Sequence, residues 1–271
     1  MVQLPELDDS ELELEERVAL LRFRRDDLRN ALTGTALVED ILRTLSWVNN
    51  CPEVSVLIIT GDGSAFSSGG NVKEMRDRQG IFAGTTLEIQ DQYRRGIQRI
   101  PLAMEQVEIP LIAAVNGAAI GAGFDLACMC DLRIASNNAV VGETFINLGI
   151  IPGDGGAWFL QRLVGYQRAA ELAFTGRLVT ADEAHSLGIF LELTDPAELL
   201  QRAKELARQI AAKPPQGVRL TKRLLKHAQR GNLSDFLDLC ACFQGICHHT
   251  DDHAEAVSAF IEKREPVFSG R

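Results

Sequence analysis

The sequence predicts an α/β fold followed by a helical segment, on two observations. Up to about residue 195, short apolar runs typical of strands alternate with stretches whose apolar residues recur at helical spacing. From residue 196 onward only helical patterns follow. Strands that alternate with helices indicate an α/β architecture. We therefore expect an α/β core over residues 1–195 and a helical module over residues 196–271 that serves in assembly.

Each expected strand is a short apolar run, and two of these runs end at clear turn residues. Residues 54–60 stop at Gly61-Asp62-Gly63, and residues 111–115 stop at Asn116-Gly117, combinations that favour turns. The other expected strands cover residues 18–23, 132–135, 139–145 and 189–193.

The expected helices carry apolar residues three and four positions apart. The clearest covers residues 35–48, where Leu37, Ile41, Leu42, Leu45 and Val48 form one stripe. The others in the first part cover residues 86–107, 122–130, 155–164 and 167–174. Those in the second part cover residues 196–212, 215–229, 233–247 and 250–264, with breaks at Pro214-Pro215 and Gly231-Asn232.

Composition argues against several classes of protein. The 271 residues are 46% hydrophobic, and the net charge of −9 comes without any basic cluster. Nucleic-acid binding needs a positive surface, so we do not expect it. No apolar run approaches the ~20 residues that span a bilayer. The acidic first residues lack the basic and apolar regions of a signal peptide. We expect a cytoplasmic protein without membrane contact.

No metal site is expected. The cysteine spacings are poor for zinc and favour free thiols in a reducing compartment. His249 and His253 lie four residues apart on an expected helix, a spacing that could hold a metal, but a solvated or subunit-facing surface is the interpretation we favour. The six cysteines are Cys51, Cys128, Cys130, Cys240, Cys242 and Cys247.

Three glycine-rich blocks have the features of a ligand site. Residues 61–71 follow a buried strand and hold a glycine pair, where backbone N–H groups can approach a ligand closely. Residues 116–126 run through Gly121-Ala122-Gly123 into a helix, whose first N–H groups and dipole stabilise negative charge. This block lacks the third glycine of a dinucleotide-binding fingerprint. Residues 141–158 place Asp154 before a second glycine pair.

These blocks, in this order and spacing, resemble the enoyl-CoA hydratase/isomerase family, also called the crotonase family. The resemblance extends from near Val18 to Phe268 and is most specific in residues 110–117, PLIAAVNG, with residues 130–135, CDLRIA, downstream. It implies a crotonase-like ββα spiral core and an acyl-coenzyme A (acyl-CoA) thioester as the substrate. Coenzyme A is part of that substrate, and no other cofactor is implied.

In this family two backbone N–H groups bind the thioester oxygen as an oxyanion hole. The matching donors here are Ser68 and Ala122, and such donors typically supply about 3–4 kcal/mol each. Lys263 and Phe268 match a tail that reaches the coenzyme A of a neighbouring subunit, and the family forms trimers that often pair into hexamers. The substrate- and coenzyme A-binding positions that the resemblance implies are Leu28, Phe66, Ser68, Gly69, Gly70, Asn71, Gly121 and Phe145.

Hydratases of the family use two glutamates to position and activate a water molecule. The first matches Asp125, which is one methylene shorter, and the second matches Phe145, which can be neither acid nor base. Glu143 lies two residues earlier, and in an extended segment it stands ~6.5 Å away along the strand, too far to substitute directly. Some isomerases of the family have an apolar residue at this position and use an aspartate in the following turn, where Asp154 lies here.

We predict a double-bond isomerase in which Asp154 or Asp125 moves a proton along the acyl chain, because a proton shuttle needs only one base. Asp154 could instead cap the helix that follows, and Asp125 could interact only with its helix dipole. Hydration by Asp125 with Glu143 or Asp154 is an alternative, and acyl-CoA binding without catalysis is another. The segment expected to shape the acyl pocket is 72–100, which includes Met75, Ile81, Phe82 and Tyr93.

Overall fold

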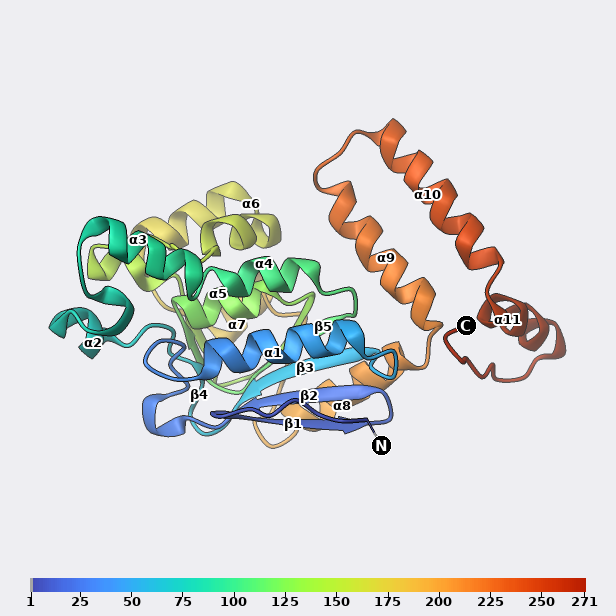
Figure 1. Cartoon of the computed structure of the whole chain (residues 1–271), viewed down its shortest axis with the longest axis horizontal. Helices are drawn as coiled ribbons and strands as arrows, with labels where there is room; N and C mark the ends of the chain where they lie inside the picture. The colour runs from blue at the N-terminus through green and yellow to red at the C-terminus, as the bar shows by residue number, and fades with distance from the viewer. Residues whose placement is uncertain (1) are drawn as a thin grey trace.

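The computed structural model describes residues 2–271 and is built around a six-stranded sheet (Figure 1). The strand order is β1-β2-β3-β5-β7-β10. β1 pairs antiparallel with β2, and the remaining pairs are parallel. The strands are β1 (Ser10–Glu15), β2 (Val18–Phe23), β3 (Val56–Gly61), β5 (Leu111–Val115), β7 (Leu132–Ser136) and β10 (Glu192–Thr194).

A smaller four-stranded sheet, in the order β4-β6-β8-β9, holds strands from each glycine-rich block. β4, β6 and β8 are parallel, and β9 pairs antiparallel with β8. Three times a strand of the large sheet is followed within a few residues by a strand of the small one and then by a helix, which confirms the expected crotonase-like ββα repeat. The strands are β4 (Ala65–Ser67), β6 (Ala118–Ile120), β8 (Val140–Gly142) and β9 (Val179–Thr180).

Helices cover both faces of the large sheet and continue beyond it. The α-helices are α1 (Leu37–Asn50), α2 (Val72–Asp77), α3 (Thr86–Arg95), α4 (Arg99–Gln106), α5 (Ala122–Met129), α6 (Gly156–Thr175), α7 (Ala181–Ser186), α8 (Leu199–Ala211), α9 (Pro215–Ala228), α10 (Leu233–His248) and α11 (Asp251–Glu262). Short 3-10 helices cover Asp26–Leu28, Gly80–Phe82 and Thr144–Leu148.

Both faces of the central strands are buried, as their continuous apolar runs predict. On β3, Leu57 and Ile59 point to the cluster that includes the apolar stripe of α1, while Val56 and Ile58 point to the opposite cluster. The second cluster is completed by Leu199, Ala203 and Ala207 of α8. α8 therefore packs on the sheet, although it lies in the expected module 196–271.

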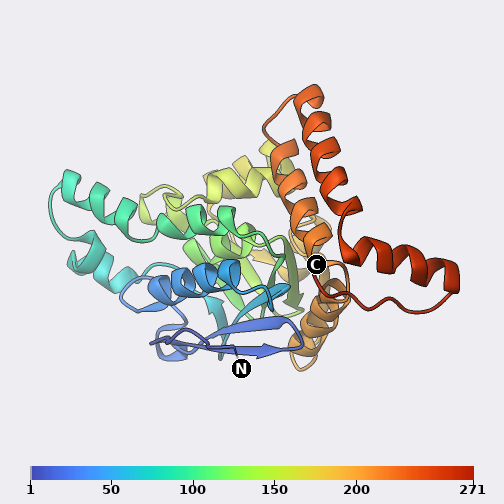
Figure 2. The same ribbon diagram turned by 45° about the vertical axis from the view of Figure 1, so that its right-hand side comes forward.

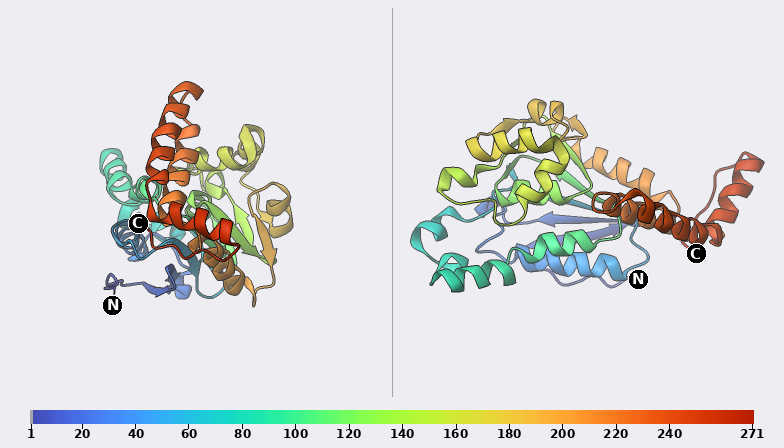
Figure 3. Two further views of the ribbon diagram at one scale, coloured as in Figure 1. Left: turned by 90° about the vertical axis from the view of Figure 1, so that its right-hand side faces the viewer. Right: turned by 90° about the horizontal axis from the view of Figure 1, so that it is seen from above.

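The last three helices form an arm that extends away from the sheets (Figures 1 and 2). Seen from above, α11 lies at the far end of the molecule from α2 and α3 (Figure 3). Lys222 of α9 fixes the start of this arm, because its buried ammonium donates to the carbonyl of Ile109 at 2.6 Å and to Asp131 at 2.7 Å. A separate assembly module remains a proposal, and its boundary lies nearer to α9. No helix within residues 2–271 is long and apolar enough to cross a bilayer.

Most expected elements are present, with shifted ends. The two helices expected at 155–164 and 167–174 are confirmed as the two halves of α6, which meet at Gly165 with non-helical φ 76° and ψ 162°. The single helix expected at 86–107 is wrong, because it divides into α3 and α4 at Gly96. The strand expected at 139–145 ends at Gly142 and turns into a 3-10 helix. β1 was missed, although its sequence SELELE alternates as an edge strand does.

Candidate active site

Two glycine-rich segments meet backbone to backbone beside β4 and β6. A Cβ atom on Gly69 would stand 2.5 Å from the carbonyl oxygen of Ile120 and 2.9 Å from the nitrogen of Ala122. A Cβ atom on Gly123 would stand 2.1 Å from the carbonyl oxygen of Ser67. Only glycine permits this approach, and Gly69 also has φ +75°, which other residues rarely adopt. The expected oxyanion donors therefore lie on adjoining segments.

The two expected donors differ in their present hydrogen bonds. Ala122 is the first residue of α5, and its N–H has no acceptor among residues 2–271, as is usual at a helix start. The Ser68 N–H donates to the carbonyl oxygen of Arg29 at 2.9 Å. Ala122 is thus ready to receive an oxyanion, whereas Ser68 must share its proton with Arg29 or exchange partners. The two-donor hole stays a prediction.

The coenzyme A-binding positions lie around the same segments. Leu28 ends a 3-10 helix, and its carbonyl accepts from the Ser68 hydroxyl at 3.3 Å. Asn71 caps α2, because its side chain accepts from the N–H groups of Lys73 and Glu74. The Phe66 ring is fully buried against Phe23, so only its backbone could contact a ligand. Gly70 lies close to Met75, at the edge of the expected acyl segment.

Three carboxyl groups from separate parts of the chain converge behind this site. Asp125 comes from the first turn of α5, Glu143 follows β8, and Asp154 lies two residues before α6. Their residues are 1%, 2% and 4% exposed. A Cβ atom on Gly156 would stand 2.2 Å from both Asp125 Oδ1 and Glu143 Oε1, so these oxygens are at most twice that distance apart. The negative charge of Asp154 also acts on Asp125 and helps to raise its pKa.

No basic side chain compensates this cluster. Asp125 Oδ1, both Glu143 oxygens and Asp154 Oδ1 have no hydrogen-bond partner within residues 2–271. Among the described residues, the Gly156 N–H at the start of α6 is the one donor to the cluster, and it reaches Asp125 Oδ2 at 3.1 Å. Burial, and then the neighbouring carboxylates, raise the pKa of Asp125 well above its ordinary value. Burial likewise raises the pKa of Glu143 to about 7 and raises that of Asp154.

These pKa values follow from simple electrostatics. Moving a carboxylate out of water disfavours its charged form, and a second carboxylate beside it adds repulsion. Three such groups without a cation cannot all be ionised near neutral pH without a large cost. The cluster therefore holds at least one proton at pH 7 and offers both a carboxylic acid and a carboxylate within one site.

Asp154 packs against the start of α5. It lies beside Ala122, Leu126 and Met129, and the gap between them is too small to hold a water molecule. The N-cap of α6 is Gly155, without a side-chain hydrogen bond, so the alternative that Asp154 is a simple helix cap is wrong. Tyr93 of α3 lies beside this turn, and the negative charge of Asp154 adds to burial in raising its pKa.

Glu143 lies beside Asp125, contrary to our expectation. That expectation assumed an extended chain up to Phe145, but β8 ends at Gly142 and Glu143 has φ −86° and ψ 66°. The turn directs the Glu143 side chain inward and brings the Phe145 ring over Gly121, where a Cβ atom would lie 3.6 Å from the ring. The apolar ring thus stands beside the oxyanion segment at the position of the family's second glutamate.

The expected acyl segment does form a hollow beside the site. A cavity of about 480 Å³ lies between α2, α3 and the 3-10 helix at 144–148, and its walls are almost entirely apolar. Its lining includes Met75, Phe82 and Tyr93, three of the four residues named from the sequence. It is a suitable place for a hydrocarbon chain.

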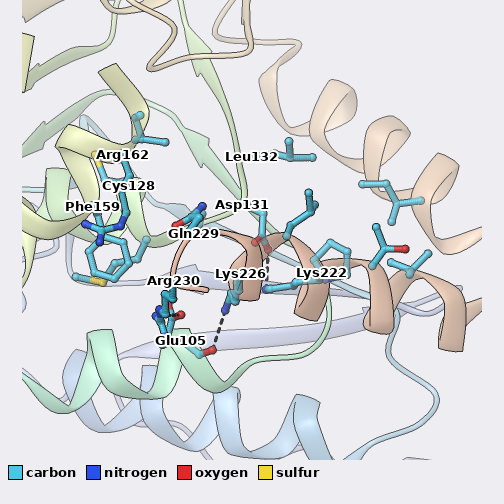
Figure 4. Close-up of a pocket in the computed structure, with 18 of the residues that line it drawn as sticks. Glu105, Cys128, Asp131, Leu132, Phe159, Arg162, Lys222, Lys226, Gln229 and Arg230 are labelled. Carbon is cyan, nitrogen blue, oxygen red and sulfur yellow. Dashed lines mark hydrogen bonds and ion pairs between the residues drawn. The ribbon is translucent and has the colours of Figure 1, made fainter. Parts of the chain in front are cut away.

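A second cavity, of about 660 Å³, lies between α9 and the ends of α5 and α6 (Figure 4). Its ammonium groups are already occupied: Lys222 bonds to Asp131, and Lys226 donates to the carbonyls of Met104 and Glu105. None of the three clustered carboxyl groups lines it. It is therefore not the site of acid–base chemistry.

Residues 2–271 contain no group of three or more His, Cys, Asp or Glu side chains arranged to hold a metal ion. His253 contacts His248 at 3.0 Å, rather than pairing with His249 as the spacing suggested. All six cysteines are free; three are buried, and Cys242 is exposed.

Comparison with known proteins agrees with this geometry. A family model described as Enoyl-CoA hydratase/isomerase matches residues 13–271. The crotonyl-CoA hydratase of Syntrophomonas wolfei is 37% identical over 95% of this chain and 96% of its own. The 1,2-epoxyphenylacetyl-CoA isomerase of Escherichia coli is 31% identical over 95% and 97%. The structure of a putative enoyl-CoA hydratase from Streptomyces coelicolor superposes with a TM-score of 0.92 at 32% identity, over 100% of this chain and 98% of that one. This chain belongs to the enoyl-CoA hydratase/isomerase, or crotonase, family.

Proposed function

We propose that this protein is an enoyl-CoA isomerase in which Asp154 is the base. The observation that carries the proposal is the placement of the ionisable groups. Asp154 lies beside Ala122, whose N–H has no acceptor within residues 2–271, and the carboxyl groups of Asp125 and Glu143 complete the buried cluster. The aromatic ring of Phe145 takes the place of the family's second glutamate. One base on one side of the acyl chain suits a proton shuttle better than the addition of water.

In the proposed reaction Asp154 removes a proton from one carbon of the acyl chain and returns it to another. The intermediate is a dienolate whose negative charge gathers on the thioester oxygen. The Ala122 N–H, at the N-terminus of α5, receives that oxygen, and Ser68 joins it if its bond to Arg29 is exchanged. No cofactor besides the coenzyme A of the substrate takes part in this scheme.

The test is an assay of the purified protein in deuterated water with trans-2- and trans-3-enoyl-CoA, read by mass spectrometry. Isomerisation gives a product of unchanged formula in which the double bond has moved, and the product carries deuterium to the extent that the proton held by Asp154 exchanges with the solvent. Asp154→Asn should abolish the reaction, whereas Asp182→Asn, an exposed aspartate in the first turn of α7, should not. Failure to convert either enoyl-CoA isomer into the other would refute isomerisation.

Hydration is the second candidate, and one structural observation favours it. Glu143 lies beside Asp125, so one carboxyl group is available to activate a water molecule and another to protonate the acyl carbon, as hydration usually requires. Several similar proteins are named hydratases, among them the crotonyl-CoA hydratase of S. wolfei. A product heavier by one water in the same assay would establish it. Tight binding with no product of either kind would instead indicate an acyl-CoA-binding protein without turnover.

We also propose that the protein forms homotrimers, which pair into hexamers. The arm exposes large apolar side chains that a subunit interface would cover; Phe260 of α11 is 86% exposed and Ile261 is 73% exposed. Scattered apolar residues are normal on a surface, but neighbours on one helix favour an interface. Lys263 and Phe268, just after α11, would then reach the coenzyme A of a neighbour. A pure monomer in analytical ultracentrifugation would refute this.

A further inference from the structure

Glu143 has no part in the reaction as proposed, although burying its carboxyl group away from water costs free energy. It is 2% exposed, neither of its carboxyl oxygens has a hydrogen-bond partner within residues 2–271, and it lines none of the cavities around the site. Burying an ionisable group in this way is expensive unless it is neutral or paired. The nearest carboxyl group to it is that of Asp125.

Asp125 is the most deeply buried of the three groups, and the charges of both other carboxyl groups act on it. Asp154 lies beside Ala122, at the start of α5. The Gly156 N–H holds Asp125 Oδ2 at 3.1 Å, which leaves Oδ1 free to face Glu143 Oε1. Two carboxyl oxygens that face each other without a donor between them repel unless one carries a proton.

We propose that Glu143 is a positioning residue that shares a proton with Asp125 and so limits the negative charge of the site while the enolate forms. Asp154 is then the carboxyl group left ionised toward the acyl chain. The shared proton stays between Asp125 and Glu143 throughout turnover. The only proton that moves is the one that Asp154 takes from a carbon of the substrate and returns.

The physical reason is the charge that develops in the reaction. An enolate oxygen gains negative charge near the cluster, and each additional carboxylate nearby raises the energy of that intermediate. A retained proton removes one of these charges. The other titratable groups around the cluster are Tyr93, which faces Asp154, and Cys128, which faces Glu143; burial raises the pKa of both, so both are neutral at pH 7. They add no charge that could replace the proton.

The first measurement needs no substrate. Infrared spectra of the protein in its native assembly, recorded from pH 5 to pH 9, should show a protonated carboxyl group at pH 7 that is lost as the pH rises further. In Glu143→Gln the band should shift in frequency and be lost at a different pH, because the proton left on Asp125 no longer has a second carboxyl group to share it. Glu143→Asp, which keeps the carboxyl group, should retain the wild-type band. Absence of the band from the wild type at pH 7 would overturn the proposal, and so would a band unchanged in Glu143→Gln. The wild-type titration decides even if a variant does not fold.

The second measurement rests on the proposed function, or on hydration, since both pass through an enolate. The wild-type kcat should fall on the basic side as the shared proton is lost, and this fall should occur at a different pH in Glu143→Gln. KM should change less than about threefold because Glu143 does not line the acyl cavity. A merely structural role would lower kcat without moving the pH profile. A basic fall that persists at the same pH in Glu143→Gln would refute the proposal. If no substrate is turned over, the proposed function fails, and the infrared titration still tests the shared proton.

Discussion

Glu143→Gln should make the folded protein more stable at pH 8, although it changes a residue at the centre of the active site. Burial raises the pKa of Glu143 from 4.5 to about 7. The folded protein therefore keeps this proton at pH values where the unfolded chain has lost it. The protonated Glu143 contributes its full share of the folding stability below about pH 4.5, and this contribution is lost as the pH rises to 7. At about 1.4 kcal/mol for each pKa unit, the ionised group costs about 3 kcal/mol above pH 7.

The substitution has a pH-independent effect as well, because an amide replaces a carboxyl group. Comparison at two pH values removes it. Urea unfolding of wild type and variant at pH 5 and pH 8 gives two differences in the free energy of unfolding, and the variant should gain about 2.5 kcal/mol between them, because part of the cost is already present at pH 5. All samples need one protein concentration, since subunit association shifts apparent stability.

A matched control is Glu198→Gln, at an exposed glutamate before α8 that makes no side-chain hydrogen bond or ion pair within residues 2–271. Its difference from wild type should be the same at both pH values. If Glu143→Gln behaves like this control, Glu143 has an ordinary pKa in the folded protein and the account of the buried cluster is wrong. A variant that is less stable at pH 8 than at pH 5, relative to wild type, would reverse the sign and refute the reasoning outright.

Three further substitutions test the packing around the site. Gly156→Ala places a Cβ atom 2.2 Å from Asp125 and Glu143 oxygens and should lower kcat at least about 100-fold, measured with the substrate that the deuterium assay identifies. Gly123→Ala places a Cβ atom 2.1 Å from the Ser67 carbonyl oxygen and should lower the free energy of unfolding in urea by about 2–3 kcal/mol. Its control is Gly217→Ala, where the nearest neighbour of the new Cβ atom is 3.8 Å away and the effect should be neutral or stabilising. Lys222→Met removes the hydrogen bonds to Asp131 and Ile109. It should lower the free energy of unfolding by about 2 kcal/mol and speed hydrogen exchange in α9. Its control, Lys204→Met, breaks a surface ion pair with Glu15 and should change stability by less than about 0.5 kcal/mol.

The fold was predictable because the strongest signals in the sequence are local. The runs at 54–60 and 111–115 become β3 and β5, and the stripe from Leu37 to Val48 faces the core as α1. The short strands β4 and β6 were not predicted, since three residues are too few to show a period and the strands form only by pairing within the small sheet. The family resemblance supplied that pairing in advance, because it carries the ββα repeat as a whole.

Two members of the carboxyl cluster were predicted from the sequence and the third was not, because the backbone turns at Glu143. Asp125 and Asp154 were found from the motif, and the sequence order of the blocks was enough to bring them together. Glu143 was discounted because an extended chain places it one strand repeat away from Phe145. The chain instead turns at Glu143, with ψ 66°, and the turn moves its side chain from the line of the strand into the space that Gly156 leaves open. A glycine directly before the acid and another at the start of α6 were the available signals. In the sequence alone, both glycines are indistinguishable from ordinary turn residues. The mutual repulsion of the three carboxyl groups, rather than any single residue, makes a shared proton necessary.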